Sequence, residues 1–546
     1  MRQAYKVASA VLVLGLAACK DALVVENLSD PDIERVFSTP QAVQQTIGSN
    51  FQACHNAVSN TNVAPQLAML GLETYSQLNN FNMGARSSIP RSAITNYRGA
   101  PSIFADYSAL SRAARLGANA LDALDKLLEE GKTLGSPAQN LRARSFAFFT
   151  IACNMGWLGM VYDSAGIVGP GMSSDSIPPL AGAKEVVAAA IALMDSSEAI
   201  ANNPASTGTG GFPVPGTWLG QSGDVSRDNF VRLVRSWRAR YRAGVARTPQ
   251  ERAAVDWAKV IADAEAGITA DFTVLVAGNS NGWNESYAVN QSYQDPTWGS
   301  MTLMYFGMAD VSGGYDAWLA TPLGARAPFL VITPDQRWPQ GTTRAAQQTA
   351  SATEPTGLTS RPYIRNRTLQ DSPGDPWGTS YYDFYRFIYI RRQTTPAAYP
   401  TYVKAENDLL AAEGYIRTGK IAEAAAKIDL SRVAKGGLPP LSGVVTSATQ
   451  PVPGGASCVP RVPAAPSFTS TACGTILEAM KYEKRMETAH TSYARWWIDG
   501  RGWGDLVEGT ALEYPVPNQE MDARQLPFYP LGGGGKSSAA KGTYGF

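Results

Sequence analysis

The chain has 546 residues, a formal net charge of +1 and 44% hydrophobic residues. This near-neutral charge argues against nucleic acid as a main partner, because nucleic-acid-binding domains carry a strongly basic surface. The hydrophobic content is ample for a folded core, and the length fits two to four domains or one large compact body.

Residues 1–18 have the organisation of a secretory signal peptide, with a charged start and a short apolar run. Leu16-Ala17-Ala18 then precedes Cys19. A cut directly before a cysteine resembles a bacterial lipobox, in which the thiol is acylated; the alternative is an ordinary signal peptide with a chance cysteine. We expect lipidation at Cys19 and a tether over residues 19–40. Because no later apolar run approaches the length of a membrane-spanning helix, we expect membrane contact through the lipid only.

An N-terminal helical part is predicted over residues 41–270. Apolar residues recur at helical spacing in six stretches, namely 40–60, 104–130, 137–162, 183–203, 228–246 and 250–268. Residues 75–105 lack such a period and are rich in Asn, Gly and Pro, which indicates a long loop, and long loops in compact proteins are usually functional or disordered. In the stretch 228–246 we expect the arginines, Arg238 and Arg240 among them, to fill mostly a solvated face.

The period collapses over residues 271–400, which we interpret as a loop-rich, ligand-binding subdomain inserted in the helical scaffold. Helices return at 401–418, 420–434 and 473–498, within a C-terminal part that covers 401–531. The low-complexity residues 532–546 are predicted to form a flexible tail. Paired helices with short breaks favour a mainly α, tetratricopeptide-like scaffold with long loop-rich insertions and few short strands.

Four cysteines remain after Cys19. Cys458 and Cys473 flank a loop rich in Pro, Ser and Thr, which predicts a local disulfide in an oxidising compartment. Cys54 and Cys153 lie in helix-like stretches; they either pair with each other or are small buried hydrophobes. The only histidines, His55 and His490, are expected to be partly exposed on helices, and the sequence predicts no metal site and no cofactor.

No catalytic motif stands out in the chain. A Gly-x-Ser-x-Gly nucleophile turn in a strand–turn–helix context is missing, so an esterase has no nucleophile. Asp and Glu are abundant, but no pair is marked out as the acid and base of a glycoside hydrolase. A surface hydrolase that uses an Asp/Glu pair therefore stays open as an alternative at this point.

Several ordered sequence blocks are the most specific signal. Residues 401–419 contain Ala405-Glu406 and end in Arg417-Thr418-Gly419; the later blocks are Gly437-Leu438-Pro439, Tyr482 to Glu487, Arg495 to Gly504, and Tyr514-Pro515-Val516-Pro517. Upstream, Arg142 to Phe149 and Asp335-Gln336-Arg337 agree with the same order. These blocks resemble the SusD/RagB family of outer-membrane nutrient-binding lipoproteins over essentially the whole mature chain. Ile428-Asp429 stands where the family usually has Asn.

The resemblance implies a non-catalytic capture protein, lipid-anchored at the outer membrane and facing the cell exterior. It implies a SusC-like TonB-dependent transporter as partner and an oligosaccharide as ligand, with peptide as the alternative. Lys20-Asp21 after Cys19 is similar, in part, to surface-export signals of this group. In the block from Arg495 to Gly504 we expect the aromatic side chains to pack on neighbouring helices and Arg495 to pair with Asp499.

Ligand contacts are expected from two loops, because sugar rings stack on aromatic side chains while Asn and Arg bind hydroxyl groups. The candidates are Tyr75, Asn80, Phe81, Arg86 and Tyr97 in the first loop, and Trp283, Asn284, Tyr287, Tyr293, Trp298, Tyr315 and Trp318 in the second. The alternative for each aromatic side chain is that it forms the core of its own loop.

Overall fold

The computed structural model describes residues 37–59, 63–98, 103–173, 176–277, 280–284, 299–368, 375–392, 396–528 and 541–546. The predictions for the signal peptide, Cys19, Tyr287, Tyr293 and Trp298 therefore lie outside the described residues. Within them, no helix is both long and apolar enough to cross a membrane.

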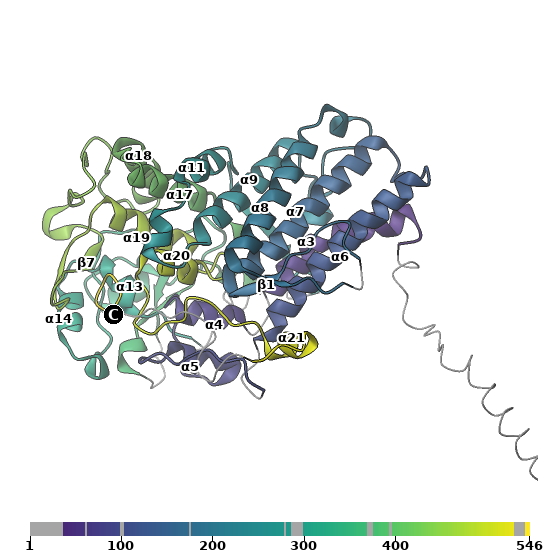
Figure 1. Cartoon of the computed structure of the whole chain (residues 1–546). Helices are drawn as coiled ribbons and strands as arrows, with labels where there is room; N and C mark the ends of the chain where they lie inside the picture. The colour runs from purple at the N-terminus through teal and green to yellow at the C-terminus, as the bar shows by residue number, and fades with distance from the viewer. Residues whose placement is uncertain are drawn as a thin grey trace, which may run out of the picture.

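Helices dominate the described part of the chain (Figure 1). The first group consists of α3 (Pro40–Ser59), α4 (Val63–Leu70), α5 (Met83–Ser87), α6 (Phe104–Glu129), α7 (Pro137–Val161), α8 (Ala183–Ala201), α9 (Arg227–Gly244), α10 (Pro249–Ala253) and α11 (Trp257–Glu265). The second consists of α13 (Leu303–Phe306), α14 (Gly314–Ala320), α15 (Arg344–Ala350), α16 (Ile388–Arg392), α17 (Lys404–Arg417), α18 (Ile421–Arg432), α19 (Ile476–Thr488), α20 (Arg495–Trp503) and α21 (Asn518–Ala523).

Short 3-10 helices and strands make up the rest of the regular structure. The 3-10 helices are η1 (Asn80–Asn82), η2 (Pro204–Thr207), η3 (Gly216–Leu219), η4 (Gly307–Ala309), η5 (Leu323–Ala325), η6 (Pro376–Gly378) and η7 (Gly455–Ser457). Four antiparallel two-stranded sheets pair β1 (Ser164–Gly166) with β2 (Leu180–Gly182), β3 (Phe272–Val276) with β6 (Ala397–Tyr402), β4 (Ile364–Asn366) with β5 (Tyr382–Phe384), and β7 (Arg461–Pro463) with β8 (Thr471–Cys473).

The long helices pack as antiparallel neighbours, which confirms the predicted tetratricopeptide-like scaffold with few short strands. In Figure 1 α3, α6, α7, α8 and α9 lie side by side, and α17 to α20 continue the array. Close packing has a visible cause at α3 and α6, where Gly117 faces Asn50, and the Asn50 side chain donates to the carbonyl of Ala113 at 3.0 Å. Helix α7 begins where Ser136 accepts from the N–H of Gln139.

The predicted single helix over residues 473–498 is wrong. Two helices, α19 and α20, occupy that stretch, and residues 489–494 separate them. His490 and Ala494 have φ of 57° and 60° there, a left-handed conformation that ends a right-handed helix. The expected pair between Arg495 and Asp499 is also not formed, because Arg495 binds Glu406 at 3.0 Å while Asp499 binds Lys484 at 2.9 Å.

The α9 arginines were expected to face mostly solvent, and for several of them this is wrong. Arg240 is 1% exposed and its guanidinium binds Glu406 of α17 at 2.7 Å. Arg238, 8% exposed, reaches the carboxylates of Glu198 and Asp263. These arginines lie between helices, so α9 is held on both sides by ion pairs with neighbouring helices.

Both histidines were expected to be partly exposed, and both are buried. His55 is covered by the ring of Trp283, with centroids 5.5 Å apart, and its Nε2 lies 2.9 Å from the carbonyl oxygen of Asn284. Burial lowers the pKa of His55 to about 4, so the ring is neutral at physiological pH. His490 packs against Phe384.

The cysteine prediction is confirmed at one pair. Cys458 and Cys473 form a disulfide with a Cα–Cα distance of 5.7 Å, next to the β7–β8 hairpin. Cys54 in α3 and Cys153 in α7 are free and buried.

One large hydrophobic core reaches from Phe37 to Tyr544. The last six residues were predicted to belong to a flexible tail, but residues 541–546 pack on this core instead. Tyr544 is 1% exposed, and its ring lies 6.2 Å from that of Tyr305. An aromatic side chain in a polar segment is enough to dock it, because burying one ring removes a large apolar area from water.

Candidate functional site

The first of the two predicted ligand loops begins at an isolated β-bridge. Tyr75 and Ser300 exchange two backbone hydrogen bonds of 2.9 and 2.8 Å. The Tyr75 ring is 4% exposed, meets the ring of Trp377 edge-on at 5.1 Å, and covers Gly378, where a Cβ atom would lie 2.5 Å from the ring. Asp375 donates its backbone N–H to the Tyr75 hydroxyl at 2.9 Å. Tyr75 is therefore part of the frame and not of the exposed surface.

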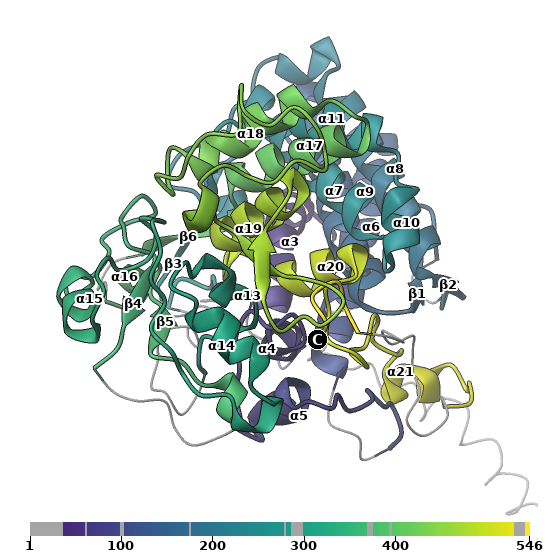
Figure 2. The same cartoon turned by 90° about the vertical axis from the view of Figure 1, so that its left-hand side faces the viewer.

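Residues 77–82 form an exposed turn on this frame. Its base is closed by the N–H of Ser76, which donates to Ser87 at 2.9 Å, and by the N–H of Gly84, which donates to the carbonyl of Leu78 at 2.7 Å. Asn79 and Asn80 are exposed and Phe81 is half-buried. The turn precedes α5 at the lower edge of the molecule in Figures 1 and 2.

The backbone of this turn is strained at two successive residues. Phe81 and Asn82 have φ of 52° and 60°, in the left-handed region that is costly for residues with a side chain. Such strain persists only where the surroundings hold it, and it clusters at ligand-binding positions. The conformation presents the side chains of Asn80, Phe81 and Asn82 from one tight corner.

Arg86 ties α5, which follows the turn, to α4 and to residues 92–93. It is 5% exposed, and its guanidinium donates to Gln66 and to the carbonyls of Ser92 and Ala93 at 3.3 Å each. Tyr97, at the end of the same segment, is 41% exposed. Of the five residues predicted here, Asn80, Phe81 and Tyr97 face the surface to some degree, whereas Tyr75 and Arg86 are buried supports.

The described residues of the second predicted loop do not lie together beside the turn 77–82. Trp283 is 7% exposed and packs on α3, with its ring 6.2 Å from that of Phe51. Asn284 is half-buried beside it, and its N–H donates to Asn56 at 2.9 Å. These two residues are held by α3, whereas the turn 77–82 sits beside α5.

Tyr315 and Trp318 are also buried, at 1% and 3% exposure. Tyr315 donates its hydroxyl to the carbonyl of Met304, and Arg326 lies over the Trp318 ring at 4.2 Å. Five of the predicted residues are thus buried, namely Tyr75, Arg86, Trp283, Tyr315 and Trp318, and ligand contact by them stays a prediction. The physical reason for the burial is that loops with few aliphatic residues use their aromatic side chains as a core.

Sequence reasoning missed two parts of this site. Asn79 and Asn82 flank the predicted residues, and the run Asn79-Asn80-Phe81-Asn82 before Gly84 carried a usable signal, because Asn is the residue most tolerant of left-handed backbone after Gly. Trp377 and Gly378, which hold Tyr75, lie 300 residues further along the chain and carry no local signal.

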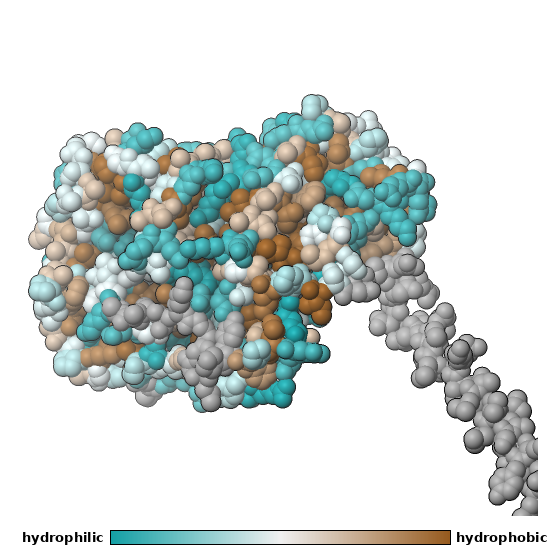
Figure 3. Space-filling view, in the orientation of Figure 1, coloured by the Kyte–Doolittle hydropathy of each residue, from teal (hydrophilic) through white to brown (hydrophobic). Residues whose placement is uncertain are grey.

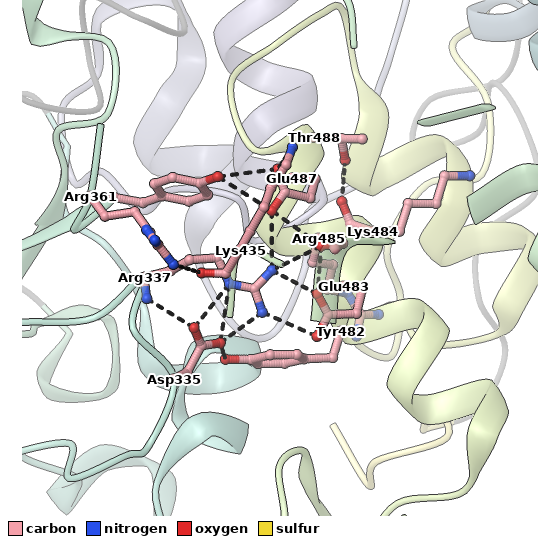
Figure 4. Close-up of polar contacts among 12 residues, drawn as sticks. Asp335, Arg337, Arg361, Lys435, Tyr482, Glu483, Lys484, Arg485, Glu487 and Thr488 are labelled. Carbon is pink, nitrogen blue, oxygen red and sulfur yellow. Dashed lines mark hydrogen bonds and ion pairs between the residues drawn. The ribbon is translucent and has the colours of Figure 1, made fainter. Parts of the chain in front are cut away.

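A second polar cluster is buried and has a different character (Figure 4). Arg337 binds Asp335 and Glu483 at 2.7 Å each and Glu487 at 3.1 Å, and Tyr482 donates to Asp335 at 2.7 Å. The carboxylate side chains are at most 1% exposed. Burial raises the pKa of Glu487, but Lys435, Arg386 and Arg337 outweigh it and hold that pKa at about 2. These carboxylates are closed off from solvent and occupied by cations, so the cluster ties residues 335–337 to α19 and offers no site for a substrate.

Comparison with known proteins identifies the fold. No family model matches the sequence, and no curated protein matches it. Solved structures do match over nearly the whole chain. A SusD superfamily protein from Bacteroides thetaiotaomicron VPI-5482 has a TM-score of 0.53 at 10% identity, covering 90% of this chain and 100% of its own.

Two structures from Bacteroides vulgatus ATCC 8482 are similar. One is a proposed sugar-binding protein with a TM-score of 0.51 at 12% identity, covering 91% of this chain and 99% of its own. The other is a SusD superfamily protein with a TM-score of 0.50 at 11% identity, covering 86% of this chain and 89% of its own. The chain therefore has the fold of the SusD superfamily, which confirms at the level of the fold the resemblance carried by its sequence blocks.

Proposed function

We propose that this protein is a non-catalytic surface lipoprotein that captures oligosaccharides and delivers them to a SusC-like TonB-dependent transporter in the outer membrane. The observation that carries the proposal is the strained, Asn-rich turn 77–82 held on a rigid scaffold of SusD-like fold. A protein of the same fold is a proposed sugar-binding protein, which supports a carbohydrate as ligand. The lipobox-like sequence before Cys19 supports the anchor.

The chemistry of the turn suits a sugar. Amide side chains at Asn79, Asn80 and Asn82 can donate to and accept from hydroxyl groups, while the Phe81 ring offers an apolar face for the C–H side of a sugar ring. The hydrogen bonds from Ser76 to Ser87 and from Gly84 to Leu78 fix the turn before the ligand arrives, so little conformational entropy is lost on binding.

The site is tested with Asn80→Ala and Phe81→Ala in affinity gels against a panel of polysaccharides, followed by calorimetry with the best ligand. We expect each substitution to weaken binding by about 1–2 kcal/mol, roughly five- to thirty-fold in Kd, because each removes a hydrogen-bonding amide or a stacking ring.

Asn202→Ala is the matched control, because Asn202 is an exposed amide at the end of α8. Unchanged retardation of both turn variants would reject the turn as the site while leaving glycan binding intact. Release of reducing sugar by the wild-type protein would instead establish a hydrolase.

Peptide is the second candidate ligand, because the same amides can pair with peptide N–H and C=O groups. A peptide library in the same calorimetric assay separates the two candidates: affinity for peptides without glycan retardation would favour the peptide-binding form of this function.

The anchor and the partner need separate tests. Cys19→Ala is expected to abolish labelling by a palmitate analogue and to release the protein from the outer membrane. Protease digestion of intact cells is expected to degrade the body, whereas protection would place it on the inner side. Co-purification with the wild-type lipoprotein tests for a TonB-dependent barrel.

A further inference from the structure

The tether leaves the folded body from a fixed point. Phe37 is 8% exposed and belongs to the core, and Thr39 caps α3 by accepting from the N–H of Ala42 at 3.2 Å. Any residue that precedes Phe37 therefore starts from a known position on the surface.

A groove lies directly beside that point. It has a volume of about 450 Å³ and is lined by Phe37 itself, by Asn119, Asp122, Lys126 and Glu130 of α6, and by Met172. Buried Leu127 adds to an apolar floor, so the groove offers both charge and apolar surface. Its volume is within the range of sites that bind a ligand or a short segment of chain.

The outer face of α6 continues this groove with cations. Arg112, Arg115 and Lys126 form no ion pair among the described residues, and helical spacing places them along one side of α6. Arg115 donates to the carbonyls of Ser173 and Ser176 at 3.3 and 2.8 Å, which fixes it against the neighbouring loop.

Apolar side chains accompany these cations. Leu116 is 38% exposed and Ile177, next to Ser176, is 63% exposed. Figure 3 shows hydrophobic residues gathered over the nearby region of β1 and α21. The groove itself is balanced in charge, because Asp122 and Glu130 line it together with Lys126 and Lys132. The part of the face around Arg112 and Arg115 is basic and lies beside exposed apolar side chains, so its natural partner is acidic and apolar.

The tether has that complementary composition. Residues 20–36 contain five acidic residues (Asp21, Glu26, Asp30, Asp32, Glu34) and two basic ones (Lys20, Arg35), so the net charge is 2 − 5 = −3. Ile33 and Val36 are apolar.

The reach is also sufficient. From Leu127, which lines the groove with Phe37, back to Arg115 is 12 residues of helix, about 18 Å at 1.5 Å per residue. An extended chain covers about 3.3–3.6 Å per residue, so the five or six residues before Phe37 span that length.

We propose that residues 30–36 of the tether dock in an extended form along α6, with Asp30 and Asp32 beside Arg115 and with Ile33 and Val36 over the apolar part of the groove. Because the segment is joined to Phe37, its local concentration at the groove is in the millimolar range, and weak contacts suffice. Docking shortens the free tether and fixes which side of the body faces the anchor. The contact needs neither acylation nor ligand, so it stands apart from the proposed function.

The test is cysteine cross-linking in the secreted full chain carrying Cys19→Ala, with Ile33→Cys and Ile177→Cys as the reporting pair. We expect rapid disulfide formation under mild oxidation. Arg115→Glu should reduce the initial rate by roughly fivefold, the upper range for an exposed ion pair, and adding Asp32→Arg should restore it. Raising the salt from low to high should also slow the reaction.

Arg227→Glu, at the start of α9, is the matched control and should leave the rate unchanged, because Arg227 does not line the groove. An Arg115→Glu rate equal to wild type, or no recovery with Asp32→Arg, would overturn the proposal, because cross-linking would then reflect random motion of the tether. Circular dichroism of each variant separates these results from misfolding.

Discussion

Glu73 and His490 form a buried pair at the point where the first ligand loop leaves the core. Glu73 is 2% exposed, and the N–H of His490 donates to its carboxyl group at 2.5 Å. Burial raises the pKa of Glu73 to about 8, although that hydrogen bond and the charge of Arg495 oppose the shift. Burial also lowers the pKa of His490 to about 3, so both side chains are neutral at neutral pH.

Because of this pair, we expect the free energy of unfolding to fall as pH rises. Since the folded pKa of Glu73 is raised above its ordinary value of 4.5, its contribution is complete below pH 4.5 and is lost as pH approaches 8. Glu73→Gln removes the titration and keeps an acceptor for His490. The free energy of unfolding of the variant minus that of wild type should therefore increase as pH rises, by up to about 1.4 kcal/mol per pH unit within this window.

Urea denaturation at pH 5, 6.5 and 8 measures the effect. Glu508→Gln, at an exposed position, is the control and should show no such trend. A constant difference between Glu73→Gln and wild type across this range would contradict the assigned protonation state.

Sequence reasoning failed at this scale for a physical reason. His55 and His490 were expected to be partly exposed because each lies in a helix-like segment. Their burial comes from Trp283 and Phe384, which approach from distant parts of the sequence. Exposure of a single residue depends on such long-range contacts, which local periodicity does not contain.

Helix α9 shows how one element can be held by charge as well as by apolar packing. Arg240 binds Glu406 with both side chains fully buried, and its guanidinium lies 3.9 Å from the centroid of Tyr402. Burial opposes ionisation of Glu406, but Arg240 and Arg495 outweigh it and lower its pKa to about 2. This stabilisation is present above pH 4.5 and is lost as pH falls toward 2.

Arg240→Met is expected to cost about 3–5 kcal/mol at neutral pH, because it leaves Glu406 buried with only one of its two arginines. Arg227→Met is the control, since Arg227 binds the exposed Asp228 and such pairs contribute about 0–1 kcal/mol. Chemical denaturation of both variants measures the difference, and equal costs would mean that the buried pair contributes no more than a surface pair.

Most helices were predictable because apolar side chains repeat along them, as in α6 and α7. The break between α19 and α20 was not, because Arg495 and its aromatic neighbours continue a helix-like composition across it. The helix ends at Ala489, whose ψ is 124°, and the left-handed backbone at His490 and Ala494 keeps it from resuming before Arg495; Glu73 holds His490 in place.

At the scale of the whole molecule, one core joins the helical array to residues far along the chain. Figure 2 shows α13 and α14 beside α19 and α20, and residues 541–546 close this region. Tyr544 donates to Glu478, and Lys481 and Arg485 lie 5.3 and 5.7 Å from its ring. The end of the described chain therefore contributes to the stability of the interior.

Tyr544→Ala is expected to lower the free energy of unfolding by about 3 kcal/mol, as for other buried aromatic side chains. Tyr97→Ala is the control, because an exposed ring should cost no more than about 0.5 kcal/mol. Urea denaturation measures both, and a Tyr544→Ala cost as small as that of Tyr97→Ala would show that residues 541–546 do not stabilise the core.

The fold class could be predicted from sequence, because ordered blocks and helical periods survive at low identity. Which residues of the candidate site are buried and which reach the surface could not be predicted. Tyr75 and Phe81 are both aromatic residues of one loop, yet one is fixed by Trp377 and the other presents a ring at the turn.

The turn 77–82 is attached to the core through the hydrogen bond between Ser76 and Ser87 at its base, while its exposed residues Asn79 and Asn80 take no part in the packing of the helices. Mutation at these positions is therefore nearly free of consequences for folding. If the turn binds the ligand as proposed, replacing a few neighbouring side chains changes what the protein recognises while the chain still folds. The same separation makes positions 79 and 80 suitable for randomised libraries that seek new ligands.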